Sequence, residues 1–205
     1  MNAWRAHDLL WIAGAPAGLL PSWADAAWLL QAPLVVRRAP AEAGNIPVGL
    51  RGRVRSERHA CQIDAASVLR RVTPEMLAGA AALAAPGQYA ALDTLRALAP
   101  RLNDAGWSWG PTGGVGFALA SGLPVLRTDS DLDLVLRIER PPDAAQQATL
   151  AALVGSVTNC RLDLQIDTGH GAFAYAEWAA GRGKVMLKTD HGPFLTATPW
   201  DVTGP

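Results

Sequence analysis

Residues 128–136 of this 205-residue chain read TDSDLDLVL, and the rest of the sequence is best understood from this stretch. In a strand, successive side chains point to opposite faces, so Asp129, Asp131 and Asp133 are expected on one face and the three leucines on the other. Folding alone does not require three carboxylates on one face. One explanation is that Asp129-Ser130-Asp131 forms a solvated turn that leads into an edge strand. The other is that the carboxylates bind a cation.

A second acidic strand favours the cation. Residues 161–167 read RLDLQID, which predicts Leu162, Leu164 and Ile166 on one face and Asp163, Gln165 and Asp167 on the other. Beside the first strand in one sheet, Asp163 would join Asp131 and Asp133. These three are the predicted catalytic residues and metal ligands, because Mg²⁺ takes oxygen ligands and shares carboxylates with substrate phosphates. Asp167 precedes Thr168-Gly169, so we expect it to cap a turn instead.

A glycine-rich run supplies the second part of a phosphate site. Residues 110–116 read GPTGGVG and lie between an expected strand at 107–109 and a helix through Phe117 and Leu119. Backbone N–H groups at such a turn can bind an anion, and the helix dipole adds to the attraction. Thr112, Gly113 and Gly114 are therefore predicted to bind substrate. A flexible loop is the alternative explanation for these glycines.

This order of glycine turn, helix, Asp-x-Asp strand and second acidic strand is that of the nucleotidyltransferase superfamily. The sequence more closely resembles the phosphoribosyl-dephospho-CoA transferases of malonate decarboxylase, the holo-acyl-carrier-protein synthases. The similar segments are 7–11 (HDLLW), 46–52 (IPVGLRG), 109–117 (WGPTGGVGF), 129–134 (DSDLDL), 163–168 (DLQIDT), Glu177-Trp178 and Lys188-Thr189. The resemblance thus covers nearly the whole chain. One departure is that the superfamily usually has Gly-Ser at the turn, whereas Gly113-Gly114 has no hydroxyl unless Thr112 provides one.

The resemblance implies a specific reaction. The enzyme would transfer a phosphoribosyl-dephospho-CoA group from 2'-(5''-triphosphoribosyl)-3'-dephospho-CoA to a serine of the malonate decarboxylase acyl-carrier protein, releasing pyrophosphate and using Mg²⁺. The alternatives are transfer to the carrier protein of citrate lyase, transfer of AMP from ATP to another hydroxyl, and a nucleotide-binding module without catalysis. The residues alone support only a metal-dependent nucleotidyl transfer.

Arginines gather in the first third of the chain, although the formal net charge is zero. Arg51 is predicted to bind phosphate, because guanidinium groups bind phosphate with two hydrogen bonds; a solubilising role is equally compatible with its position. For Arg58 we expect only the solubilising role. Lys188, on an expected last strand at 185–188, is a further candidate phosphate ligand or a solvent-facing lysine. The four histidines show no ligand spacing, and a structural hydrogen bond is expected for His7.

Composition favours an α+β protein of two parts. We predict a β-rich, arginine-bearing module at 1–72 and a nucleotidyltransferase-like mixed sheet flanked by helices at 73–205, with helices starting at Thr73 and Asp143 and another stopping at Pro100. A further helix is expected to include Phe173, Glu177 and Trp178, and an extra loop through residues 122–124 is expected before the first acidic strand. Cys61 and Cys160 lack metal-ligand spacing and are expected to be reduced and inert. No stretch is long and apolar enough to cross a bilayer, and no signal peptide is apparent. We therefore expect a cytoplasmic protein without membrane or nucleic-acid partners.

Overall fold

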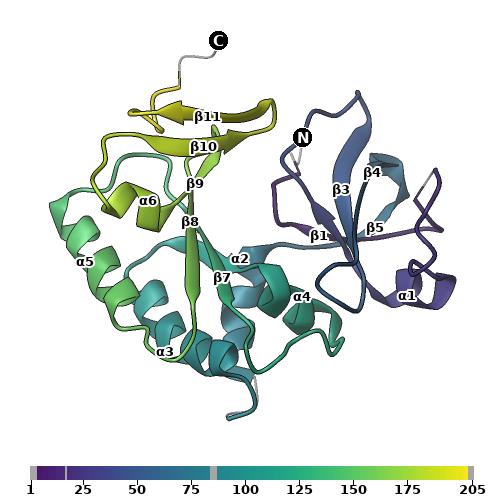
Figure 1. Ribbon diagram of the computed structural model, residues 1–205, viewed down its shortest axis with the longest axis horizontal. Coiled ribbons are helices and arrows are strands. Elements are labelled where there is room, and N and C mark those ends of the chain that lie inside the picture. The colour runs from purple at the N-terminus through teal and green to yellow at the C-terminus, as the bar shows by residue number, and fades with distance from the viewer. Residues whose placement is uncertain (1–3, 17, 84–86, 203–205) are drawn as a thin grey trace.

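The computed structural model describes residues 4–16, 18–83 and 87–202. Two β-sheets lie side by side, the first formed by the N-terminal third of the chain and the second by the remainder (Figure 1). The first sheet is antiparallel and the second is mixed and flanked by helices, which confirms the predicted α+β class. None of the described helices has the length and apolar character needed to span a membrane.

The N-terminal sheet has five antiparallel strands in the order β4-β3-β2-β1-β5. Their bounds are β1 (Leu9–Ile12), β2 (Leu34–Val36), β3 (Asn45–Arg51), β4 (Arg58–Asp64) and β5 (Val68–Val72). β3 alternates as its sequence predicts, with Ile46, Val48 and Leu50 buried in the core of this sheet. A short helix α1 (Ala26–Gln31) begins at Asp25, whose carboxylate accepts the Trp28 N–H at 2.8 Å. A 3₁₀ turn, η1 (Ala65–Ser67), joins β4 to β5.

The second sheet has six strands in the order β11-β10-β9-β8-β7-β6. Their bounds are β6 (Ser108–Pro111), β7 (Leu132–Arg137), β8 (Leu162–Asp167), β9 (Ala172–Ala174), β10 (Val185–Thr189) and β11 (Gly192–Thr196). Its helical elements are α2 (Pro74–Leu77), η2 (Ala78–Leu83), α3 (Ala90–Asp104), α4 (Gly113–Ser121), α5 (Ala144–Gly155) and α6 (Tyr175–Ala179). Only β7 and β8 pair in parallel; the other pairs of this sheet are antiparallel.

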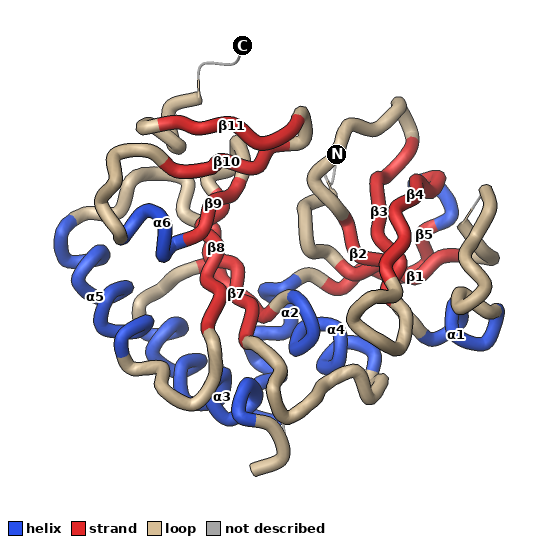
Figure 2. Tube along the Cα trace, viewed as in Figure 1, coloured by secondary structure: helices blue, strands red, loops and turns tan. Residues whose placement is uncertain are grey.

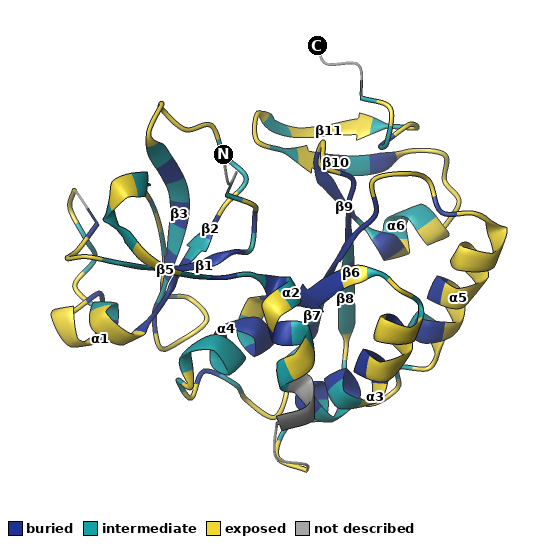
Figure 3. Ribbon diagram, turned by 180° about the vertical axis from the view of Figure 1, so that it is seen from behind, coloured by how far each residue is buried: buried dark blue, intermediate teal, exposed yellow. Residues whose placement is uncertain are grey.

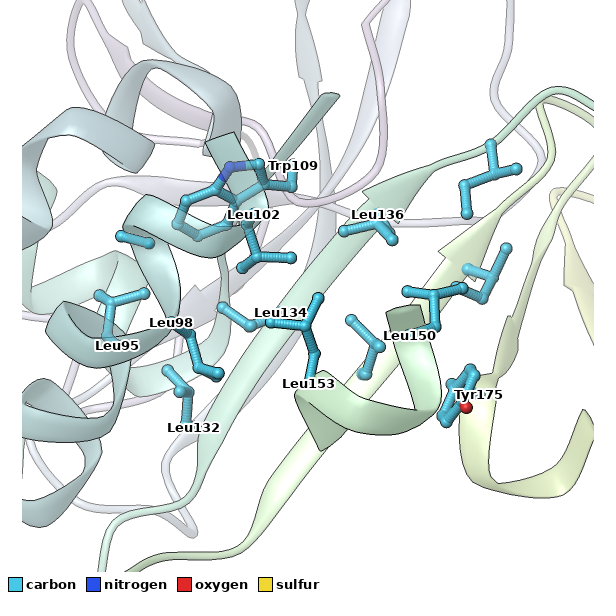
Figure 4. Packing of buried hydrophobic residues seen from close by; sticks show 14 of the residues in the cluster. Leu95, Leu98, Leu102, Trp109, Leu132, Leu134, Leu136, Leu150, Leu153 and Tyr175 are labelled. Carbon is cyan, nitrogen blue, oxygen red and sulfur yellow. The ribbon is translucent and has the colours of Figure 1, made fainter. Parts of the chain in front are cut away.

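The helices divide between the two sides of this sheet. α3, α5 and α6 lie on the outer side, while α2 and α4 lie between the sheet and the N-terminal strands (Figure 2). On the outer side Leu132, Leu134 and Leu136 of β7 pack against leucines of α3 and α5, among them Leu98 and Leu150 (Figure 4). Complete burial of such a side chain stabilises the fold by about 1.5–3 kcal/mol. The leucine face of β7 therefore fixes its aspartate face toward the N-terminal half.

Both predicted helix starts are confirmed. The Thr73 hydroxyl accepts the Met76 N–H, and Asp143 forms a reciprocal capping box with Gln146. The predicted stop at Pro100 is wrong, because α3 continues to Asp104. Proline costs a helix interior about 3 kcal/mol, but the turn beyond it is held by the buried Leu102 and by a 2.9 Å hydrogen bond from the Trp109 indole to Asn103.

Three other segments differ from prediction. β7 begins only at Leu132, because residues 128–130 form a turn in which the Ser130 hydroxyl accepts the Arg127 N–H. Phe173, expected on a helix, lies on β9, where it pairs with Ile166 of β8. β10 is not the last strand, since β11 follows it as a hairpin. The helix before β7 is followed by the expected extra loop, which spans residues 122–131.

Apolar side chains join the two halves of the chain. Trp28 of α1 packs with Phe117 of α4, and Leu9 and Val72 pack with Leu77 of α2. Figure 3 shows the buried residues continuing from β1 through α2 and α4 into β6 and β7. This shared core fixes the position of the N-terminal strands relative to β7 and β8.

Candidate active site

Two acidic side chains meet on the inner face of the second sheet. β7 and β8 pair in parallel with Asp133 opposite Asp163, as the sequence pattern predicts, and Asp131 directly precedes β7. Burial raises the pKa of Asp133, and repulsion from Asp163 and Asp131 raises it further. Attraction to Arg51 and Arg55 opposes these effects only in part. The three predicted carboxylates therefore share one electrostatic site, and their repulsion is not offset within it.

The glycine turn lies directly against Asp133. Gly113, the first residue of α4, has a φ of +55°, and a β-carbon there would lie 1.8 Å from Asp133 Oδ2. The Thr112 N–H donates to the Asp133 carbonyl at 2.9 Å, which ties the turn to β7. Both the backbone conformation and the lack of space require glycine at position 113. The N-terminus of α4 and the carboxylates consequently face the same hollow.

This hollow extends between the two halves of the chain. A cavity of about 490 Å³ is lined by Leu9, Val35 and Arg51 from the N-terminal sheet and by Thr112 and Asp133 from the second half, among others. A second cavity of about 370 Å³ shares Arg51, Arg58, Gly113 and Asp133 with the first, and also reaches Gly114 and Asp131. Asp133 thus lies where a mainly uncharged cavity and an arginine-rich cavity join, and Asp131 lines the arginine-rich one.

Arg51 connects the N-terminal sheet to this site. Its guanidinium lies over the Phe117 ring, 5.2 Å from the centroid, and would be 3.5 Å from a β-carbon at Gly114. Its carbonyl accepts the Trp28 indole N–H at 2.7 Å. Burial, and next to it the charge of Arg58, lower the pKa of Arg51 to about 10, so it remains cationic at neutral pH. The structure therefore brings the predicted Arg51 to the glycine turn.

The positions of two arginines at this site were not predicted from the sequence. Arg58, for which only a solubilising role was expected, lines both cavities, and Arg55 lines the arginine-rich one. Partial burial and then Arg55 lower the pKa of Arg58, although the residue as a whole is exposed. The sequence contained one indication of this role, because Arg55 and Arg58 follow Arg51 closely, in the loop and strand that come directly after β3.

His7 is a further cavity residue whose position the sequence did not reveal. Its φ of +77° is the only positive value among the described residues other than glycine, a conformation that is uncommon and costly for such residues. Burial lowers the pKa of His7 to about 4, helped by Arg38 and Arg137, while Asp167 and a side-chain hydrogen bond with Gln165 oppose the change. The imidazole is therefore neutral near pH 7. The backbone N–H of His7 donates to the backbone carbonyl of Val36 at 3.0 Å, a structural hydrogen bond of the kind expected for this residue.

Asp167 and Lys188 lie elsewhere. Asp167 caps the turn after β8, as predicted, by accepting the Gly169 N–H at 2.9 Å, and it also pairs with Arg38 and Arg137. Lys188 is exposed on β10. It pairs with Ala172 of β9, which in turn pairs with Asp167 of β8, and Asp167 is four residues along β8 from Asp163. The structure does not bring Lys188 to the carboxylates.

The carboxylates suit a cation that is bound jointly by protein and substrate. No group of three or more His, Cys, Asp or Glu side chains within residues 4–16, 18–83 and 87–202 is arranged to hold a metal ion by itself. Mg²⁺ usually takes only one or two protein carboxylates and completes its shell with water and substrate phosphates. After burial, which is the main cause, the charges of Asp163 and Asp131 also raise the pKa of Asp133, and a cation bound there would relieve this repulsion.

Comparison with known proteins assigns the chain to a family. The family described as phosphoribosyl-dephospho-CoA transferase MdcG matches with its N-terminal domain at residues 5–74 and its C-terminal domain at residues 56–199. The chain belongs to the phosphoribosyl-dephospho-CoA transferase family. It is 44% identical to the phosphoribosyl-dephospho-CoA transferase of Pseudomonas putida strain GB-1, covering 98% of this chain and 97% of that one. It is 40% identical to that of Klebsiella pneumoniae strain 342, covering 96% of each.

The match includes both halves of the chain, so the N-terminal sheet is part of the phosphoribosyl-dephospho-CoA transferase family and not an unrelated addition. No solved structure was found to match. The resemblance stated from the sequence is thereby confirmed, and the transferase activity in the name of these relatives is supported for this chain.

Proposed function

We propose that the protein is a nucleotidyltransferase that attaches phosphoribosyl-dephospho-CoA to a serine of the malonate decarboxylase acyl-carrier protein. The donor is 2'-(5''-triphosphoribosyl)-3'-dephospho-CoA and the second product is pyrophosphate. One observation carries the proposal: Asp133 and Asp163 lie side by side on parallel strands, and Asp133 lies against Gly113 at the N-terminus of α4. Such a site suits phosphoryl transfer, in which positioning and charge stabilisation matter more than covalent chemistry by the protein.

Each group at the site has a distinct role. The backbone N–H groups at Gly113 and Gly114 bind phosphate oxygens at the start of α4. Arg51 adds a half-buried cation beside them. Asp163 accepts the proton of the incoming serine hydroxyl, whose oxygen then bonds to the 5''-phosphorus as the bond to the departing pyrophosphate breaks.

Magnesium is the proposed cofactor, and Asp131, Asp133 and Asp163 are the residues that would hold it. When bound, Mg²⁺ would neutralise charge on the triphosphate as pyrophosphate departs. The contact of Asp133 with Gly113 would hold this ion close to the phosphate-binding N–H groups at the start of α4. A protein that acts on this donor and carrier would work in the cytoplasm, with no membrane or nucleic-acid partner.

The test is an acceptor assay. Apo acyl-carrier protein of malonate decarboxylase is incubated with the donor and MgCl₂, and both the mass of the carrier and the release of pyrophosphate are followed. Asp131→Ala and Asp133→Ala are each expected to lower the transfer rate by about 10³-fold, because a metal site contributes several kcal/mol of charge stabilisation. Asp104→Ala is the matched control: Asp104 is exposed at the end of α3 and lines neither cavity, so the substitution should leave the rate unchanged.

Two results would contradict the proposal. Undiminished transfer by both aspartate variants would refute the metal assignment. Faster loading of the citrate lyase carrier, or modification of a hydroxyl with ATP in place of the donor, would change the assigned substrate while leaving the site intact.

A further inference from the structure

Six arginines of the described chain neutralise a carboxylate, but three that line the active-site cavities do not. The arginines that take part in ion pairs within the described chain are Arg38, Arg53, Arg71, Arg96, Arg127 and Arg137. Arg51, Arg55 and Arg58 form no ion pair with any residue that the structure describes. Moreover, Nε of Arg51 is buried and has no hydrogen-bond partner. Burying such a donor unpaired is costly, which points to an anionic ligand.

The hairpin that carries these arginines is built to hold them in place. The Glu57 carboxylate accepts the N–H groups of Arg53 and Val54 at 2.7 and 3.2 Å, which closes the loop between β3 and β4. The Arg53 guanidinium lies 4.6 Å from the Trp28 ring centroid and pairs with Asp25, so it fastens the loop to α1. Arg55 therefore projects from an anchored loop, and Arg58 from the first position of β4.

The two cavities differ in how much of their lining is charged. Charged side chains form most of the smaller one, whereas the larger one has Arg37, Arg51, Arg58 and Asp133 among mainly uncharged residues. The arginine-rich cavity holds Arg51, Arg55 and Arg58 beside Gly113 and Gly114. The larger cavity continues from the same junction along Leu9, Val35 and Phe117 to the neutral His7 and Gln165. Asp133 lines both. The donor has a comparable asymmetry: its triphosphate lies at one end, and the remainder is a long organic portion whose charge is confined to the diphosphate of dephospho-CoA.

We propose that Arg51, Arg55 and Arg58 of the N-terminal sheet form a pyrophosphate site that receives the two terminal phosphates of the donor. This inference rests on the proposed transferase function and assigns the direction in which the donor lies. The phosphoribosyl-dephospho-CoA end occupies the larger cavity, and the 5''-phosphorus lies at the junction beside Asp133. The serine oxygen bonds to that phosphorus, the bond from phosphorus to the bridging oxygen breaks, and pyrophosphate leaves with the electron pair toward the arginines. The serine proton passes to Asp163.

The test measures binding of inorganic pyrophosphate to the full chain by isothermal titration calorimetry in the presence of MgCl₂. Arg55→Ala and Arg58→Ala are each expected to weaken binding by about tenfold or more, the usual effect of losing charge-assisted hydrogen bonds. Arg70→Ala is the matched control, because Arg70 is also an exposed arginine of this sheet but stacks on Trp11, 4.4 Å from the ring centroid. It should change binding less than about twofold.

Arg51 needs a milder substitution because it packs on Phe117. Arg51→Lys keeps the charge and loses the two-pronged geometry, so a weakening of about tenfold with an unchanged melting temperature would support the site. Wild-type affinity in both Arg55→Ala and Arg58→Ala would overturn it, as would an equal loss in Arg70→Ala.

The same variants separate this inference from the proposed function. Selective loss of pyrophosphate binding in a protein that never modifies the carrier would support the arginine site and refute the transferase reaction. Normal transfer and normal pyrophosphate binding by Arg55→Ala and Arg58→Ala would leave the transferase standing and overturn the arginine site.

Discussion

Both ends of β7 and β8 carry a pair of charged side chains, but the charges repel each other at one end and neutralise each other at the opposite end. At the start of the strands Asp133 faces Asp163, and no ion pair is formed by either within the described chain. At their far end, on the same face and about 13 Å away at 3.3 Å per residue, Arg137 faces Asp167 and the charges are paired. Arg137 also bonds Glu75 of α2 at 2.9 Å, and Asp167 bonds Arg38 of the N-terminal half at 2.8 Å.

The comparison distinguishes a reaction site at the unpaired end from a joint at the paired end, meaning the ion-pair network that holds the two halves of the chain together. The ion pairs at this end join β7, β8, α2 and the segment after β2 in one network, so they hold the N-terminal sheet at a fixed distance from β7 and β8. The unpaired end retains like charges whose repulsion only a cationic ligand can relieve. The joint holds the walls of the cavity in place, and the carboxylates between those walls form no ion pair and can therefore bind a cationic ligand.

Removing the charge at the paired end should have the largest effect. Asp167→Asn is expected to lower the free energy of unfolding by about 3 kcal/mol, since it leaves the guanidinium of Arg137, only 3% exposed, with Glu75 as its sole carboxylate. Urea denaturation followed by tryptophan fluorescence would measure this. Asp129→Asn breaks the exposed pair with Arg127 and serves as the control, with no measurable change expected. Equal stability of the two variants would mean that the network is not a joint.

A second comparison tests how closely the unpaired end is fitted to its helix. Gly113 is the first residue of α4 and Gly122 follows its last residue, and both have positive φ. A β-carbon added at Gly113 would clash with the Asp133 carboxylate, whereas one added at Gly122 would have no atom within 4 Å. Alanine at either position should cost about 1–2 kcal/mol of stability for the left-handed backbone. Only Gly113→Ala should also slow carrier modification, by about 10²-fold, because it displaces Asp133. Similar rates for the two variants would show that contact with Gly113 does not position the carboxylate.

The local patterns in the sequence predicted much of this arrangement. Alternation of leucine and aspartate gave the two strands at 132–137 and 162–167 and put Asp133 and Asp163 on one face, because period two is a property of the strand itself. Capping side chains likewise identified the helix starts at Thr73 and Asp143. Such signals lie within a few residues of the structure that they specify.

Contacts between distant segments could not be predicted in this way. Arg38 meets Asp167 across 129 positions of sequence, so nothing local distinguished Asp167 as half of a joint. Arg58 looked like any exposed arginine until the fold placed β4 beside α4. The stop expected at Pro100 failed for the same reason, since tertiary packing of Leu102 outweighs a local preference.

The smallest expected effect is a gain in folding stability, which we expect when the charge of Asp133 at the unpaired end is removed. Because burial and the neighbouring carboxylates raise the pKa of Asp133, the folded protein binds that proton more tightly than the unfolded chain does. This raised pKa therefore makes the metal-free protein less stable as pH rises above the ordinary carboxylate value of 3.8, and the full penalty is present at neutral pH. Asp133→Asn removes it and should stabilise the metal-free protein at pH 7 by about 1 kcal/mol, a gain typical of replacing a strained functional residue.

Thermal melts at several pH values would measure this gain, which corresponds to a rise of about 2–4 °C for a chain of this size. The difference between the variant and the wild type should shrink toward acid pH, where Asp133 is protonated, and MgCl₂ should stabilise only the wild type. Asp167→Asn, made in the same strands, should be less stable than the wild type under all these conditions. A loss of stability in Asp133→Asn at pH 7 would place Asp133 in the same class as Asp167, and the distinction between joint and site would fail.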